Sequence, residues 1–147
     1  GIYEAFLSSD RAKTFFHGHS YTANPLACAV AIASLDLFAE SDVLGRVQRL
    51  EQLLRVGLDP LRALPHVGDV RVIGGVGVVE LRSGELRGDG GYLDQIGPRL
   101  GTAFLERGLL LRPLGNVVYF MPPYAITSAE VEWSLGIIER VLSETCA

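Results

Sequence analysis

Lysine, cysteine and long apolar runs are scarce in this chain, and each scarcity excludes a class of protein. Lys13 is the only lysine, and the other twelve of the thirteen basic residues are arginine. Because the net charge is −4 and no basic stripe is present, we expect no nucleic-acid partner. The two cysteines, Cys28 and Cys146, form neither a disulfide framework nor a metal-ligand spacing. We expect Cys28 to be a small core residue.

A membrane span is also missing, since no apolar run reaches the roughly 18 residues that a bilayer needs. The sequence starts with Gly1 and shows no signal-peptide pattern. We therefore expect a cytoplasmic protein without a membrane partner, and the initial glycine suggests a fragment or a tag remnant. The three histidines are not spaced as a metal-binding set, so we expect no metal site. They are His17, His19 and His66.

The rest of the composition is typical of a globular domain, with 48% hydrophobic and 20% charged residues. Apolar residues at helical spacing predict five helices. These cover residues 1–12, 24–40, 41–64 and 93–107, and a last helix that begins at Thr127 or Ser128. Glu130 is placed to complete a capping box if Thr127 is the cap.

Branched apolar residues predict the strands. Residues 67–81 form two strands, or one strand bent at Gly74-Gly75. Residues 109–113 and 117–121 form a hairpin, for which Leu114-Gly115-Asn116 is the turn signal. Between these pairs, residues 82–91 read as a solvated loop without identifiable chemistry. The order of elements favours a two-layer α+β domain with a small, mainly antiparallel sheet covered by helices.

The segment from His17 to Cys28 joins a polar loop to a helix. Asn24 is a favoured N-cap residue, and Pro25 suits the first helical position. The apolar, alanine-rich sequence that follows suggests a central, buried helix. The loop is either a plain connection or a place where backbone and hydroxyl donors hold an anion.

Arg112 is the best single candidate for binding chemistry outside that loop. It ends an apolar predicted strand, and a guanidinium group there could bind a substrate carboxylate through two hydrogen bonds. The alternative is an arginine that reaches water or pairs with an internal glutamate. Tyr119 and Tyr124 flank the Met121-Pro122-Pro123 turn, where structural roles are favoured.

Three segments resemble the class III pyridoxal-phosphate-dependent aminotransferases. In that family His-Gly-x-Thr/Ser-x-x-x-Asn-Pro-Leu-Ala-Cys/Ala precedes a long helix, as residues 17–28 do here. Residues 69–80 and 107–124 carry the rest of the resemblance. The run from Tyr119 to Tyr124 is similar to the family members of biotin biosynthesis. Members that act on ornithine, acetylornithine or 4-aminobutyrate usually carry arginine near the position of Tyr119.

The resemblance implies a fold-type I homodimer that binds pyridoxal 5'-phosphate and acts on small molecules. The implied reaction converts 8-amino-7-oxononanoate to 7,8-diaminononanoate, with S-adenosylmethionine as amino donor. By the same resemblance, Ser20 donates to the phosphate of the cofactor in the neighbouring subunit. Gly18 borders the substrate pocket, Arg112 holds the substrate carboxylate and Tyr119 lines the same pocket.

The resemblance also implies a division of the chain and a missing group. Residues 1–23 correspond to the end of the large cofactor domain with its interface loop, and residues 24–147 to the C-terminal small domain. His19 stands where the family often has proline. The family's Schiff-base lysine lies upstream of this region, and Lys13 is too close to His17 to replace it. We therefore expect no catalytic residue here and no activity of the chain alone.

Two alternatives stay open. One is a class III aminotransferase that uses another ω-amino donor. The other is a free-standing, non-catalytic module for dimerisation or binding.

Overall fold

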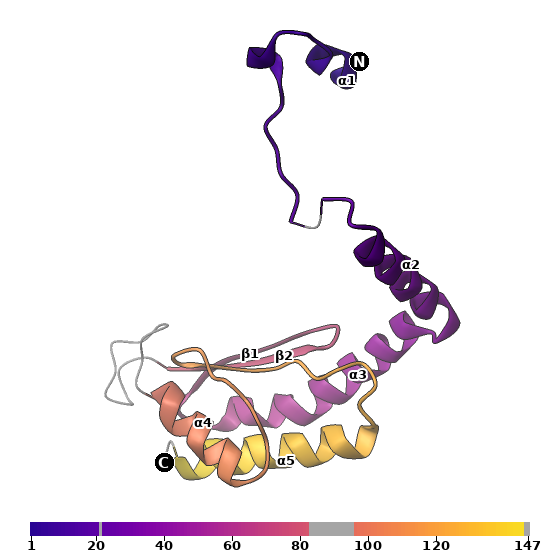
Figure 1. Cartoon of the computed structure of the whole chain (residues 1–147). Coiled ribbons are helices and arrows are strands. Elements are labelled where there is room, and N and C mark those ends of the chain that lie inside the picture. The colour runs from indigo at the N-terminus through magenta and orange to yellow at the C-terminus, as the bar shows by residue number, and fades with distance from the viewer. Residues whose placement is uncertain (21, 83–95, 146–147) are drawn as a thin grey trace. The chain divides into compact units, whose positions relative to one another are not determined.

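A computed structural model describes residues 1–20, 22–82 and 96–145 of the chain (Figure 1). Two compact units are present, Gly1–Ser41 and Asp42–Ala147. The predicted boundary between residues 23 and 24 concerns the family's two domains and stays a prediction. No helix in the described ranges combines the length and the apolar character needed to cross a bilayer.

The first unit holds two short helices and one long helix. These are α1 (Ile2–Phe6), the 3₁₀ helix η1 (Arg11–Lys13) and α2 (Pro25–Glu40). The prediction of one helix over residues 1–12 is wrong because side chains compete for the backbone donors there. The Ser8 hydroxyl accepts from the Asp10 N–H at 3.0 Å, and Asp10 Oδ1 accepts from the Ala12 N–H at 3.0 Å.

Helix α2 begins and ends as predicted, but the prediction that it is a core helix is wrong. None of its residues is buried, Ala27 alone is partly buried, and Cys28 is exposed rather than part of a core. Its surface is apolar on every side, as in Leu26, Val30 and Leu35. Burial of such a surface needs an apolar partner, and the described part of the first unit provides none.

The second unit begins with α3 (Val43–Leu58), which is followed by the 3₁₀ helix η2 (Asp59–Ala63). Asp42 caps α3, since its Oδ1 accepts from the Gly45 N–H at 3.3 Å. The predicted apolar face is confirmed at Leu50, Leu54 and Leu58, which are buried. The α-helix ends before the predicted Leu64 because Pro60 has no N–H to donate to it.

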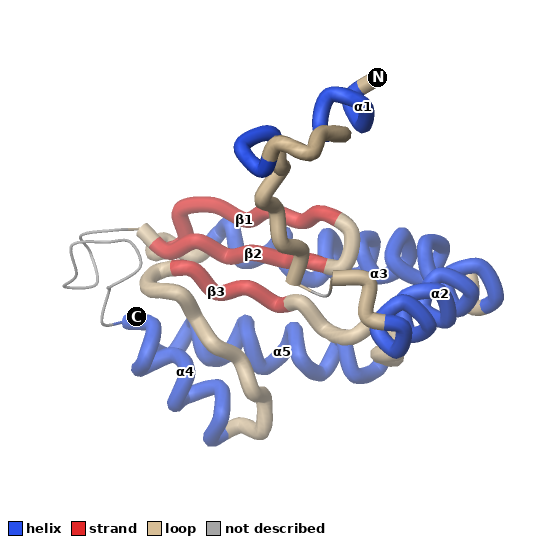
Figure 2. Tube along the Cα trace, turned by 45° about the horizontal axis from the view of Figure 1, so that its top comes forward, coloured by secondary structure: helices blue, strands red, loops and turns tan. Residues whose placement is uncertain are grey.

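Three antiparallel strands form one sheet in the order β1-β2-β3 (Figure 2). They are β1 (Val67–Ile73), β2 (Val76–Leu81) and β3 (Val117–Phe120). Two strands rather than one bent strand span residues 67–81, because Gly74 adopts a φ of +51° and closes a hairpin. In register across the sheet, Val70, Val79 and Val118 bury their side chains on one face.

Helices α3, α4 (Ile96–Glu106) and α5 (Ser128–Thr145) cover that buried face (Figure 1). Leu100 and Phe104 from α4 and Val141 from α5 are fully buried in the shared core. The predicted α4 terminus is confirmed by Gly108, whose φ is +82°. The predicted helix start at Leu93 and nearly all of the predicted 82–91 loop lie outside the described residues.

The predicted strand over residues 109–113 is wrong. Among the described residues, the only ladder contact near this segment is an isolated bridge between Leu114 and Val117. Pro113 and Leu111 instead lie against α4, since a Cβ built on Gly101 would be 3.7 Å from Pro113 Cδ and 3.9 Å from the Leu111 oxygen. Packing on α4 therefore takes this segment away from the hairpin that the sequence predicts.

Candidate active site

The polar loop before α2 presents Gly18 and Ser20 on the surface of the first unit. Within the described residues the Ser20 hydroxyl has no hydrogen-bond partner. Thr22 donates both its N–H, at 3.1 Å, and its hydroxyl to the carbonyl of His19, which bends the chain between Ser20 and α2. Thr22 and Ala23 both have positive φ, at 40° and 53°, a region that costs energy for residues other than glycine.

Asn24 decides which donors an anion could use at this loop. Its Oδ1 accepts from the N–H groups of Leu26 at 3.0 Å and Ala27 at 3.1 Å, which confirms the predicted N-cap. These first N–H groups of α2 are therefore already bonded. An anion at this loop would depend on the Ser20 hydroxyl rather than on the helix terminus.

Arg112 lies in the second unit, on the segment that connects α4 to β3. Its side chain is exposed, and among the described residues no carboxylate pairs with it. Leu111 and Pro113 on either side are partly buried, so the backbone is packed while the guanidinium is in solvent. Of the alternatives that the sequence left open, the described structure shows no internal glutamate partner for Arg112, and the exposed guanidinium reaches water.

Tyr119 lies on the face of the sheet that the helices do not cover. Val118 and Phe120 point into the core, and Tyr119 between them is partly buried on the outer face. Val78 is its cross-strand partner on β2, and Arg71 is the partner of Val78 on β1. Within the described structure no hydrogen bond joins Tyr119 to Arg112.

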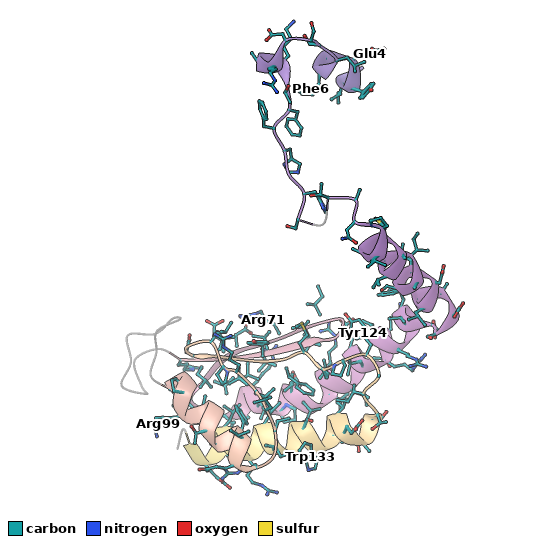
Figure 3. The ribbon with its side chains drawn as sticks, viewed as in Figure 1. Glu4, Phe6, Arg71, Arg99, Tyr124 and Trp133 are labelled. Carbon is teal, nitrogen blue, oxygen red and sulfur yellow. The ribbon has the colours of Figure 1, made fainter. Side chains whose placement is uncertain are left out.

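Ion pairs occupy the charged part of that outer face. Arg71 lies on the sheet (Figure 3). Its guanidinium contacts Asp69 and Glu80 at 2.8 Å each. The hydrogen bond from Arg71 lowers the pKa of the Asp69 carboxyl, and the bond to Glu80 raises the pKa of Arg71. Since these charges satisfy one another, Arg71 is not a free anion-binding group in the way that Arg112 is.

The turn between Arg112 and Tyr119 is fixed by Asn116, a residue that sequence reasoning assigned only to a turn. Asn116 is 6% exposed, its Nδ2 donates to the Leu81 carbonyl at 2.7 Å, and its carbonyl accepts from the Leu81 N–H at 2.9 Å. The Gly-Asn pair after Leu114 was the signal for a turn. Its partner lies 35 residues earlier, which no local pattern reveals.

The four predicted site residues fall in both units. Gly18 and Ser20 belong to the first unit, and Arg112 and Tyr119 belong to the second. Among the residues that the structure describes, no three His, Cys, Asp or Glu side chains gather as a metal site would require.

Sequence comparison with known proteins shows which family this chain is similar to. The profile of the class-III aminotransferase family matches residues 1–142. The adenosylmethionine-8-amino-7-oxononanoate aminotransferase of Synechococcus elongatus is 48% identical over 143 residues, which are 97% of this chain and 32% of that protein. The enzyme of the same name from Geobacter sulfurreducens is 43% identical over 141 residues, 95% of this chain and 31% of that protein.

A solved structure agrees with the sequence comparisons. The crystal structure of the Methanocaldococcus jannaschii adenosylmethionine-8-amino-7-oxononanoate aminotransferase superposes with a TM-score of 0.81 at 34% identity. The aligned region covers 97% of this chain and 33% of the solved chain. The present chain therefore spans about a third of the length of these relatives. The resemblance noted in the sequence and the expected fold class are thereby confirmed. The chain belongs to the class-III aminotransferase family.

Proposed function

We propose that the protein containing this chain is a cytoplasmic, homodimeric aminotransferase of biotin biosynthesis. Its reaction transfers an amino group from S-adenosylmethionine to 8-amino-7-oxononanoate, which gives 7,8-diaminononanoate. The names of the relatives at 48% and 43% identity support this reaction. The observation that carries the proposal within this chain is the exposed Arg112 guanidinium, which has no carboxylate partner among the described residues.

Arg112 binds the carboxylate of the acceptor in this proposal. A guanidinium group presents two parallel N–H donors to a carboxylate, and such charge-assisted bonds are about twice as strong as neutral ones. The packed backbone on both sides of Arg112 limits the positions that its side chain can reach. Tyr119, on the outer face of the sheet, lines the same substrate pocket in this proposal.

Pyridoxal 5'-phosphate, when bound, supplies the electron-withdrawing ring through which transaminases carry the amino group. The loop of the first unit fits the phosphate of such a cofactor, because the exposed Ser20 hydroxyl has no partner in the described residues. In our proposal Ser20 donates to the phosphate held by the neighbouring subunit. Gly18, which carries no side chain, borders the substrate pocket.

The chain by itself is proposed to be inactive. Lys13 is its only lysine, and it lies four positions before His17, too near to serve as the family's Schiff-base lysine. The amine that binds the cofactor must then come from a part of the protein other than this sequence.

The carboxylate contact can be tested with an acceptor that lacks the charge. We expect the natural-length protein to use 8-amino-7-oxononanoate about 10- to 100-fold better than its methyl ester, as judged by kcat/KM. Arg112→Ala should abolish this preference and Arg112→Lys should keep part of it.

Arg140→Ala is the matched control, since Arg140 is an exposed arginine on α5. It should leave the preference for the acid unchanged. An Arg112→Ala protein that still prefers the acid over the ester to the wild-type extent would contradict the assignment of Arg112.

A further inference from the structure

The segment that bears Arg112 is joined to the strand that bears Tyr119 by a tight turn. Leu114 and Val117 exchange two backbone hydrogen bonds, at 2.8 and 3.0 Å, and Gly115 between them has a φ of +59°. The turn is also close to α4, since a Cβ on Gly97 would lie 2.9 Å from the Gly115 oxygen. These contacts fix the shape of the turn and its distance from α4.

Among the described residues, Asn116 alone ties this turn to the sheet through a side chain. In an antiparallel ladder a bonded pair exchanges two backbone N–H···O=C bonds. Leu81 and Asn116 make one such bond in the usual way, at 2.9 Å, whereas the second comes from the Asn116 side chain at 2.7 Å. The amide of Asn116 thus extends the β2–β3 ladder by one pair beyond Glu80 and Val117.

The partner of Asn116 is itself firmly placed. Leu81 is 1% exposed, and it is paired on its other side with Val67 of β1. A buried donor and a buried acceptor therefore meet in the core, and loss of either group leaves the other without a partner. The buried bond between Asn116 and Leu81 therefore joins the turn to β2.

We propose that Asn116 is a positioning residue for Arg112. By holding the turn on Leu81, it fixes the Arg112 segment relative to Tyr119 and so sets the affinity for the acceptor carboxylate. This inference rests on the proposed function, because it assumes that Arg112 binds that carboxylate. Asn116 does not touch the substrate and is not a catalytic residue.

Kinetics of the natural-length protein separate positioning from simple loss of stability. Asn116→Ala should raise the KM for 8-amino-7-oxononanoate about tenfold, while kcat and the KM of the donor change less than twofold. In an Arg112→Ala background the same substitution should have no further effect on that KM. Asn116→Ser, which keeps a shorter donor at the same place, is the milder variant and should give an intermediate KM.

Val141→Ala is the control for stability, because Val141 is fully buried on α5 and forms no part of the turn. It should lower stability without changing the KM of the acceptor. The proposal would be overturned if Val141→Ala raised the KM of the acceptor as much as Asn116→Ala does. It would also be overturned if Asn116→Ala raised this KM equally in the wild-type and the Arg112→Ala proteins.

Hydrogen exchange gives a second readout that does not require activity. Asn116→Ala should speed exchange of the backbone amides in residues 111–117, and Val141→Ala should not do so selectively. Unchanged exchange in this segment would overturn the role of Asn116. Absence of transamination by the wild-type protein would instead overturn the proposed function, and the exchange result would still show whether Asn116 fixes the turn.

Discussion

Thr127 and Glu130 satisfy each other's polar groups at the start of α5. Glu130 Oε2 accepts from the Thr127 N–H at 2.8 Å and from its hydroxyl at 2.7 Å, and Thr127 Oγ1 accepts from the Glu130 N–H at 3.3 Å. This is the capping box that the sequence predicted. We expect Thr127→Ala to lower the free energy of unfolding by about 1 kcal/mol, measured by urea denaturation.

The same contact predicts a dependence on pH. Hydrogen bonds from the Thr127 backbone and hydroxyl lower the pKa of the Glu130 carboxyl in the folded state. A carboxyl with a lowered pKa stabilises the fold above its unfolded pKa, and this contribution is lost as the pH falls through its folded pKa. The stability difference between wild type and Glu130→Ala should therefore be present at pH 7 and disappear in strong acid.

Glu132→Ala is the matched control for this prediction, because Glu132 is an exposed glutamate on the same helix. The stability of the Glu132→Ala protein relative to wild type should change little between pH 7 and strong acid. A Glu130→Ala deficit that persists unchanged in acid would show that the carboxylate is not the stabilising group.

Individual residues were predictable where their partners are neighbours in the sequence. Asn24 and Thr127 were identified as caps because a cap bonds to N–H groups two or three residues away. Asn116 was recognised only as a turn residue, since its bond to Leu81 depends on how β2 and β3 align. For Arg112 the sequence leaves open whether the guanidinium binds a substrate carboxylate, reaches water or pairs with an internal glutamate, and only the structure shows that it is exposed and that no described carboxylate reaches it.

Among the secondary-structure elements, α4 shows how two glycines in one helix can have opposite roles. Gly97 faces the turn before β3, where an added Cβ would lie 2.9 Å from the Gly115 oxygen, whereas Gly101 has ordinary space for a Cβ. Gly97→Ala should therefore destabilise the protein by about 1–3 kcal/mol through overpacking. Gly101→Ala should stabilise it by about 0.5–1 kcal/mol, because alanine favours the helix.

Thermal and urea unfolding of the two variants side by side would measure this difference. Both substitutions add one methyl group to the same helix, so the comparison isolates the contact with Gly115. Equal effects of the two substitutions would contradict the close approach of α4 to the turn.

Elements with a clear internal period were predicted well. The apolar spacing of α3 and α5 and the glycine turn between β1 and β2 are local features, and the structure confirms them. The strand predicted over residues 109–113 failed because a strand needs a partner. Its residues had the right composition, but Pro113 and Leu111 pack on α4. In the described part of the chain, residues 109–113 form no ladder.

At the scale of the whole molecule, the two units differ in how much they bury. The second unit has one hydrophobic core that includes Leu54, Phe104 and Val141. Helix α2 in the first unit has no buried residue. The sequence could not reveal this difference, because an alanine-rich apolar helix looks the same whether or not a partner covers it.

This difference predicts unequal protection from hydrogen exchange. Local opening is easiest where few apolar contacts must be broken, so the amides of α2 should exchange much faster than those of α5 in the monomeric chain. Exchange measured by mass spectrometry, with the monomeric state checked by sedimentation, would test this. Equal protection of α2 and α5 in the monomer would contradict the exposed state of α2.

The central claim concerns the reaction, and one assay tests it most directly. The natural-length protein would be supplied with pyridoxal phosphate and 8-amino-7-oxononanoate, together with S-adenosylmethionine, lysine or alanine as the donor. We expect 7,8-diaminononanoate, identified by mass spectrometry, to form with S-adenosylmethionine and not with the other two donors. Product formed with lysine or alanine but not with S-adenosylmethionine would indicate another ω-amino donor. Absence of product with all three donors would contradict the assignment to biotin biosynthesis.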